Sequence, residues 1–159
     1  MDSNRLVRRE SMVYPPNWEY LRQDDGPHYI FGTCYREDGT WTTLDLDGDP
    51  PFDLVKQDFP FTDVSAIHCV SIVHCWDYID TAHVLRKSYR ALRPGGVMWL
   101  GEDNRDVDVA DGGNVRSFYS ARSLTRMLSN AGFGTIEEDS ILKVTGRVTR
   151  PRFALKATK

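Results

Sequence analysis

Apolar residues gather in two short runs in the middle of the chain, and a helical pattern separates them. The run Ala66–Val73 has the length and the β-branched content of a strand that is buried on both faces. In Asp80–Leu92 the apolar side chains recur at helical spacing, which predicts one buried stripe: Ala82, Leu85, Tyr89 and Leu92. The second run, Val97–Gly101, predicts another strand. Strand, helix and strand in this order predict a βαβ unit with a right-handed crossover.

Both ends of the helix Asp80–Leu92 carry boundary signals. Asp80 and Thr81 are candidate N-cap residues, because their side-chain oxygens can accept hydrogen bonds from the first N–H groups of a helix. The tripeptide Pro94–Gly96 follows, and this composition is typical of a turn that ends a helix.

Similar patterns predict the remaining elements. Segments rich in aromatic and β-branched residues indicate strands at His28–Cys34 and Trp41–Leu46. Three more short segments are also predicted as strands: Phe52–Gln57, Thr135–Ser140 and Arg152–Ala157. The last two are predicted to form a hairpin. Ser120 is predicted to cap a helix that runs to Asn130, with Leu124 and Leu128 turned inward.

Composition places the chain among ordinary globular proteins. Its 159 residues suit a single domain, with 40% hydrophobic and 27% charged residues. A net charge of −3 gives no electrostatic reason to expect a nucleic-acid partner, and no apolar run approaches the length of a membrane span. We interpret residues 1–27 as an N-terminal arm and 28–159 as the domain. Without a hydrophobic signal segment or CxxC spacing among its three cysteines, the chain is expected in the cytoplasm.

Several short motifs follow one another in the second half of the chain. They are Asp58, Pro60, Phe61 and Asp63, then Arg90 and Leu92–Gly96, then Ser117–Ser120, Leu124, Leu128 and Ala131–Phe133. In this order they resemble the class I S-adenosylmethionine-dependent methyltransferase domain, over residues 40–139. The resemblance implies a Rossmann-like α/β fold, whose mostly parallel sheet ends in an antiparallel C-terminal hairpin. It also implies S-adenosylmethionine as the cofactor.

The connection between the first two predicted strands is short. Only Tyr35–Thr40 separates them, whereas neighbouring parallel strands usually need a crossover of about a dozen residues. Six extended residues still reach about 20 Å. Two arrangements follow: a parallel pair that lacks the first crossover helix, or an antiparallel hairpin. We prefer the first, because the resemblance implies that both strands are parallel.

The resemblance also implies which residues hold the cofactor. Gly32 matches one glycine of the family's glycine-rich turn, and Cys34 stands where another glycine is expected. Asp45 matches the acidic residue that accepts hydrogen bonds from both ribose hydroxyls, or it belongs to a polar turn. Asp58 matches the residue that meets the adenine amino group, and Phe59 either lines the adenine pocket or belongs to the core.

The end of the strand Ala66–Val73 is the candidate acceptor site, because ligands of open α/β sheets bind beyond the carboxyl ends of the strands. His74 and Asp77 are the candidate catalytic residues. A histidine of near-neutral pKa could remove a proton from the acceptor, although a strand-end histidine bonded to the backbone is the alternative. Four more side chains are predicted to face the substrate: Tyr78, Glu102, Asp103 and Tyr119.

No metal site is expected. Alternation along a strand would put His68 and His74 on one face and Cys69 and Cys75 on the other. Four ligands divided in this way do not surround one ion, and no CxxC spacing supports zinc.

The preferred function is methyl transfer from S-adenosylmethionine to a small molecule or a cell-surface precursor. The alternative is a catalytically inactive, methyltransferase-like binding or scaffold protein, which the incomplete glycine turn favours. A homodimer or another protein partner is left open.

Overall fold

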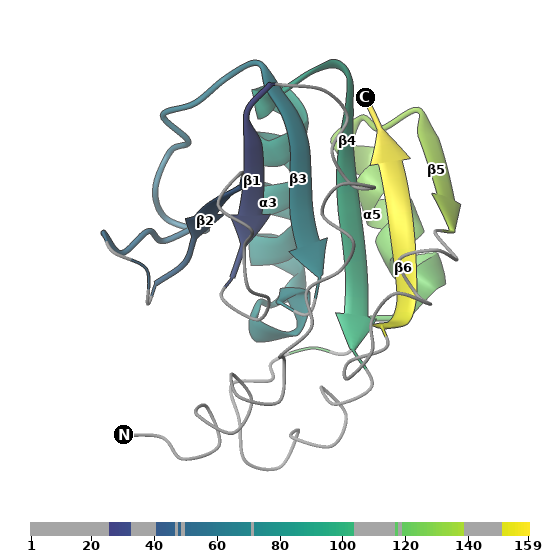
Figure 1. Cartoon of the computed structure of the whole chain (residues 1–159). Coiled ribbons are helices and arrows are strands. Elements are labelled where there is room, and N and C mark those ends of the chain that lie inside the picture. Colours follow the sequence, from purple (N-terminus) through teal and green to yellow (C-terminus); the bar gives the residue numbers. More distant parts are fainter. Residues whose placement is uncertain are drawn as a thin grey trace.

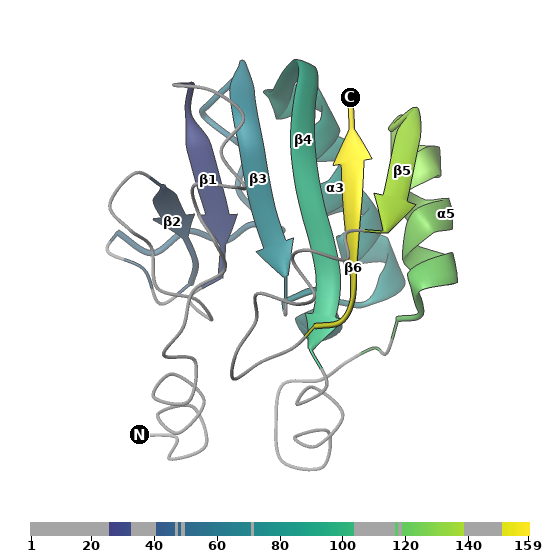
Figure 2. The ribbon, with the colours of Figure 1, turned by 45° about the vertical axis from the view of Figure 1, so that its right-hand side comes forward.

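The computed structural model describes residues 26–32, 41–46, 48, 50–70, 72–103, 117, 119–138 and 151–159. At Val70, His74, Asp103, Pro151 and Arg152 it describes the backbone alone. Within these residues, a six-stranded sheet has both α-helices on one of its faces (Figures 1 and 2). Residues 1–25 of the expected arm 1–27 and the connection 33–40, including the expected loss of a crossover helix, lie outside them.

The sheet has the order β2-β1-β3-β4-β6-β5. Its strands are β1 (His28–Phe31), β2 (Thr42–Leu44), β3 (Val64–Val70), β4 (Leu92–Asp103), β5 (Thr135–Glu138) and β6 (Pro151–Thr158). The strands β2, β1, β3 and β4 are parallel, and β6 is antiparallel to both β4 and β5. The predicted mostly parallel sheet with an antiparallel C-terminal pair is therefore confirmed. The parallel pairing of β1 with β2 also excludes the hairpin alternative.

Two helices and one 3-10 turn complete the described elements: α3 (Tyr78–Ala91), α5 (Ala121–Ala131) and η1 (Val73–Cys75). The predicted cap of α5 is confirmed, since Ser120 accepts a hydrogen bond from the Ser123 N–H at 3.0 Å. The predicted N-cap of α3, Asp80, was wrong by three residues. Asp77 is the N-cap and accepts from the Asp80 N–H at 2.8 Å, so Asp80 lies in the first turn, where the helix dipole favours a carboxylate.

The buried face of α3 also differs from the predicted apolar stripe. Leu85 is buried as predicted, but Ala82 and Tyr89 are half-buried. The buried positions of α3 include three polar residues that apolar periodicity overlooks: Thr81, Lys87 and Ser88. Ser88 is accommodated because its hydroxyl donates to the Val84 carbonyl at 2.8 Å.

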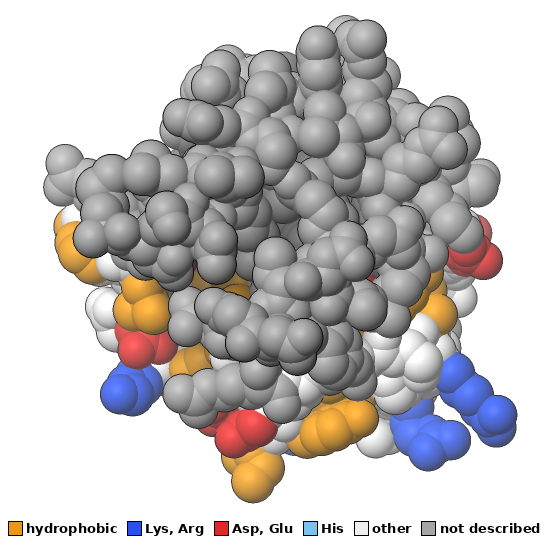
Figure 3. Space-filling model, turned by 90° about the horizontal axis from the view of Figure 1, so that it is seen from below, with side chains coloured by type: hydrophobic (Ala, Val, Ile, Leu, Met, Phe, Trp, Pro, Cys, Tyr) orange, Lys and Arg blue, Asp and Glu red, His pale blue; other side chains and the backbone are white. Residues whose placement is uncertain are grey.

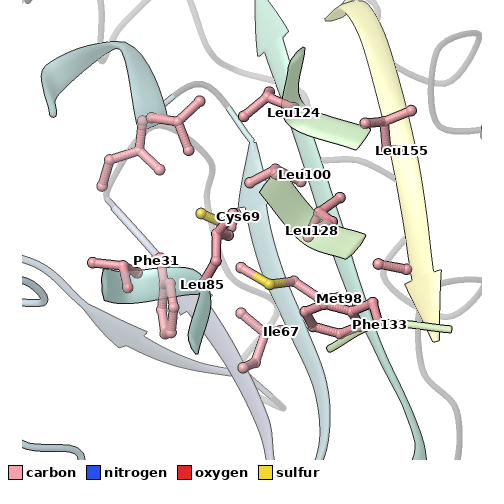
Figure 4. Close-up of a cluster of buried hydrophobic side chains, with 14 of the residues drawn as sticks. Phe31, Ile67, Cys69, Leu85, Met98, Leu100, Leu124, Leu128, Phe133 and Leu155 are labelled. Carbon is pink, nitrogen blue, oxygen red and sulfur yellow. The ribbon is translucent and has the colours of Figure 1, made fainter. Parts of the chain in front are cut away.

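The main core lies between the sheet and the two helices. Side chains from the strands meet Leu85 of α3 and Leu124 and Leu128 of α5, which point inward as predicted (Figure 4). The opposite face of the sheet carries a second buried cluster: Ile30, Trp41, Ala66, Val97, Trp99 and Ala154. Because successive strand residues alternate between faces, both clusters follow from the same strands.

The strand predicted at Phe52–Gln57 is wrong, because this segment folds as a turn. Asp53 Oδ1 accepts from the N–H groups of Val55 and Lys56, each at 3.0 Å. The Gln57 N–H in turn donates to the Asp53 carbonyl at 2.9 Å. An aspartate that satisfies its neighbours' N–H groups competes with a sheet ladder, and here the local bonds prevail.

Candidate functional site

The ends of the parallel strands define one edge of the sheet. The strands β1, β2, β3 and β4 end there at Phe31, Leu44, Val70 and Asp103. Gly32, Asp45 and Glu102 therefore lie at the same edge. Figure 3 views the molecule from this side, with described acidic, basic and hydrophobic side chains along its margin. Ligands of open α/β sheets bind at such an edge.

Gly32 follows β1 and lies close to the ends of β2 and β3. Its N–H donates to the Leu44 carbonyl at 2.9 Å, which ties the end of β1 to that of β2. Its φ angle is +87°, a left-handed conformation that glycine adopts without steric cost. A Cβ atom at this position would lie 3.0 Å from Ile72 Cδ1, just beyond β3. The glycine turn is therefore tightly packed against the chain's own Ile72.

Asp45 follows β2 directly and lies beside the Gly32 turn. Its carbonyl accepts hydrogen bonds from the N–H groups of Gly48 at 2.9 Å and Phe52 at 2.8 Å. Main-chain bonds thus hold the turn, and the half-exposed carboxylate is not needed for that purpose. A carboxylate in this place can accept from two hydroxyl groups at once.

Phe59 belongs to a group of aromatic rings beneath the end of β1. Its centroid lies 5.6 Å from Phe31 and 4.9 Å from Phe61, with an edge contact to the first and a stack on the second. The Lys87 ammonium lies 4.6 Å from the same ring. The structure thus places Phe59 at the margin of the core, while the preceding Asp58 is exposed.

The candidates that follow β3 have different surroundings. The strand ends at Val70, and His74 falls in the 3-10 turn, so the predicted alternation of faces does not extend to His74 and Cys75. The side chains of His74 and Asp103 lie outside the described part of the chain. Asp77 already accepts the cap bond of α3, and Tyr78 beside it is 55% exposed.

Tyr119 lies at the centre of a network that the sequence did not reveal. Its hydroxyl donates to the Trp76 carbonyl at 3.0 Å. A hydroxyl has one proton, so the 2.8 Å bond between Tyr119 and Thr81 has Thr81 as the donor. Burial raises the pKa of Tyr119, which is 1% exposed, and the Tyr78 ring meets it edge-on at 5.1 Å. The network joins the loop after β3, the first turn of α3 and the segment before α5.

Glu102 is a buried carboxylate near the end of β4. It lies close enough to Cys69 and Tyr119 to raise the pKa of each, although burial is the larger cause for both. Cys69 therefore remains a neutral thiol. Contact of Glu102 with a substrate remains a prediction.

The sequence led us to expect neither a metal site nor a membrane span, and the described residues bear on both. Within them, no group of three or more His, Cys, Asp or Glu side chains could hold a metal ion. Neither described helix is long and apolar enough to cross a membrane.

Replacing Tyr119 with phenylalanine should lower the free energy of unfolding by about 1 to 2 kcal/mol, because Thr81 and the Trp76 carbonyl would lose a buried partner. Urea denaturation measures this. Tyr29→Phe is the matched control, since the Tyr29 ring stacks on Phe61 at 4.2 Å and phenylalanine keeps that contact. Equal stability losses in the two variants would contradict the assignment.

Comparison with known proteins identifies the fold. No protein-family model and no curated protein sequence matches the chain. Many solved structures do match it in three dimensions, and SAM-dependent methyltransferases are among them. The chain has the fold of the class I S-adenosylmethionine-dependent methyltransferases, as its motifs predicted.

Three structures illustrate the likeness. A SAM-dependent methyltransferase from Archaeoglobus fulgidus has a TM-score of 0.67 at 11% identity, over 99% of this chain and 95% of that one. One from Methanosarcina mazei has a TM-score of 0.60 at 10% identity, over 91% and 97%. Human N-acetylserotonin methyltransferase in complex with SAM has a TM-score of 0.51 at 18% identity. That match covers 82% of this chain and 39% of the human chain.

Proposed function

We propose that the protein transfers a methyl group from S-adenosylmethionine to a small-molecule or cell-surface-precursor acceptor. One observation carries the proposal: a left-handed glycine turn at Gly32 is bonded to the strand end that precedes Asp45, at the ligand-binding edge of a methyltransferase fold. The small-molecule acceptor class rests on the resemblance to the family.

The residues at this edge fit the cofactor. Gly32 offers backbone without a Cβ atom, and the Asp45 carboxylate has the two oxygens that a ribose diol needs. Asp58 and Phe59 would contact the adenine, since the Phe59 ring touches Phe31, the residue before Gly32. The structurally similar human N-acetylserotonin methyltransferase was solved with SAM bound.

When bound, S-adenosylmethionine would supply a methyl group already activated by its sulfonium. The chain would then contribute mainly alignment of the acceptor with that methyl group, which can account for much of the rate. His74 would take the acceptor's proton. Asp77 uses one carboxylate oxygen to cap α3, and its other oxygen would be available to the acceptor. The exposed Tyr78 ring would contact the acceptor. Glu102, Asp103 and Tyr119 are the other residues that we propose to face the substrate.

The second candidate, an inactive binding or scaffold protein, is favoured by a specific observation. Ile72 packs against the Gly32 turn, and Phe59 packs against Phe31, Phe61 and Lys87. The chain's own side chains thus contact two of the surfaces assigned to the cofactor. Ligand binding separates the two candidates.

S-adenosylhomocysteine, the demethylated cofactor, should stabilise the protein. At about 100 times its dissociation constant a ligand adds about 2.7 kcal/mol, or roughly 5 to 10 °C in Tm for a domain of this size. Asp45→Asn should remove this shift, because a neutral amide has one acceptor oxygen in place of two. Glu137→Gln, an exposed neutralisation on β5, should retain it.

Thermal unfolding with and without the ligand measures both effects. Absence of any shift in the wild-type protein at millimolar ligand would refute methyl transfer by this chain and leave the binding-protein candidate. A shift that survives in Asp45→Asn would remove Asp45 from the site.

A further inference from the structure

Lys87 is a buried lysine on α3 whose ammonium group is fully engaged. Its Nζ donates to three main-chain carbonyls, those of Leu54, of Val55 at 3.1 Å and of Gln57 at 2.8 Å. The same ammonium lies 4.6 Å from the centroid of the Phe59 ring. One side chain of the helix thus contacts four residues of a segment about thirty positions away.

That segment needs such a donor. Residues 50–63 contain no strand, so the carbonyls of the turn have no sheet partner. Asp53 satisfies N–H groups on one side of the turn, whereas Lys87 satisfies the carbonyls on the other. A buried carbonyl without a donor is costly, so the turn depends on both side chains.

The charge of Lys87 is balanced by its surroundings. Burial lowers its pKa, while the carboxylates of Asp58 and Asp53 oppose that change and Arg90 on the same helix adds to it. Three charge-assisted hydrogen bonds and the face of an aromatic ring also favour the ammonium form. The carboxylate of Asp58 therefore lies near Lys87 in the fold and favours its charged form.

We propose that Lys87 is a positioning residue for the cofactor, and this rests on the proposed function. It holds the turn at Leu54–Gln57 and the ring of Phe59 against α3, and Asp58 lies between these two held points. The helix α3, rather than a strand, thereby positions Asp58 and Phe59, the residues that we propose to contact the adenine. S-adenosylhomocysteine affinity then depends on a residue that does not itself touch the ligand.

Lys87→Met keeps the length of the side chain and removes its charge. Amide hydrogen exchange of the unliganded protein should become faster across residues 53–59, because the carbonyls lose their donor. S-adenosylhomocysteine binding, measured by calorimetry, should weaken about tenfold through loss of preorganisation. Arg86→Met removes a charge from an exposed position of the same helix and should change neither measurement.

A pH profile supplies a readout that a purely structural role would not move, and it needs no destabilised variant. Affinity of the wild-type protein should fall as pH rises toward the ordinary lysine pKa of about 10.4, because burial lowers the pKa of Lys87 and the ammonium loses its proton before that of an exposed lysine. The ligand's own amino group also titrates there, so the profile is compared with that of Lys87→Arg. The difference between the two profiles reports Lys87.

The outcomes separate this inference from the proposed function. Weaker binding in Lys87→Met, faster exchange and a pH-dependent difference from Lys87→Arg would support it. If Lys87→Met and Arg86→Met both bind S-adenosylhomocysteine as tightly as the wild-type protein does, the positioning role is overturned and the proposed function stays intact. If the wild-type protein binds no ligand, the proposed function fails and the cofactor role of Lys87 fails with it.

Discussion

Replacing Gly101 with alanine is expected to lower the free energy of unfolding by about 3 kcal/mol or more. Gly101 lies in β4, where it pairs with Val70 of β3 and with Ala154 of β6. A Cβ atom here would overlap the carbonyl oxygen of Phe153 and lie 3.2 Å from the Cα of Ala154. These are backbone atoms held by ladders on both sides, so they cannot rotate away as a flexible side chain would.

Urea denaturation of the variant measures this effect. Gly134→Ala is the matched control, because nothing lies within 4 Å of a Cβ atom placed there. The control should stay within about 0.5 kcal/mol of the wild-type protein. A Gly101→Ala protein as stable as the control would show that β4 and β6 can separate without cost.

Gly32→Ala should lower the free energy of unfolding by about 2 to 3 kcal/mol and abolish S-adenosylhomocysteine binding. The left-handed φ of +87° costs an alanine about 1 to 2 kcal/mol, and its methyl group would press on Ile72 Cδ1 at 3.0 Å. Either response of the chain disturbs the turn: a change of φ breaks the bond to Leu44, or Ile72 moves.

Two further variants separate the conformational cost of Gly32→Ala from its steric cost. Gly95→Ala also has a positive φ, of +79°, but no atom lies within 4 Å of its Cβ position, so it should show the conformational cost alone. Ile72→Val removes Cδ1, and the double variant with Gly32→Ala should therefore recover the steric part. Equal losses in Gly32→Ala and Gly95→Ala, with no recovery in the double variant, would contradict the packing of Ile72 on this turn.

The parts of the fold that sequence patterns predicted are those with local causes. Continuous apolar runs located the strands around Ile67 and Met98, and helical spacing of apolar residues located α3. The cap that marks the start of α5 depends on Ser120 and Ser123, three positions apart. The turn at Phe52–Gln57 could not be predicted in this way. It depends on Lys87, which is 33 positions from Leu54, and an apolar pattern does not register a lysine as a core residue.

In the candidate site, too, the features with local causes were predicted and those that depend on distant residues were not. Gly32 and Asp45 were assigned to the cofactor site by resemblance to the family, each after a predicted strand, and the bond from Gly32 to Leu44 brings the two strand ends together. The network of Tyr119 was not predicted, because its partners Thr81 and Trp76 lie 38 and 43 positions away. Position at a strand end is readable from one sequence, whereas side-chain hydrogen bonds between distant segments are not.

The order of the strands has a consequence for how the protein is made. β6 comes after β5 in the chain but lies between β4 and β5 in the sheet. While a ribosome is still adding residues 151–158, β4 exposes one whole row of unpaired N–H and C=O groups, and β5 has no neighbour to join. The sheet is completed by insertion of a strand rather than by growth at its edge. Slow synthesis of residues 151–158 would therefore prolong the interval in which nascent chains can pair with one another.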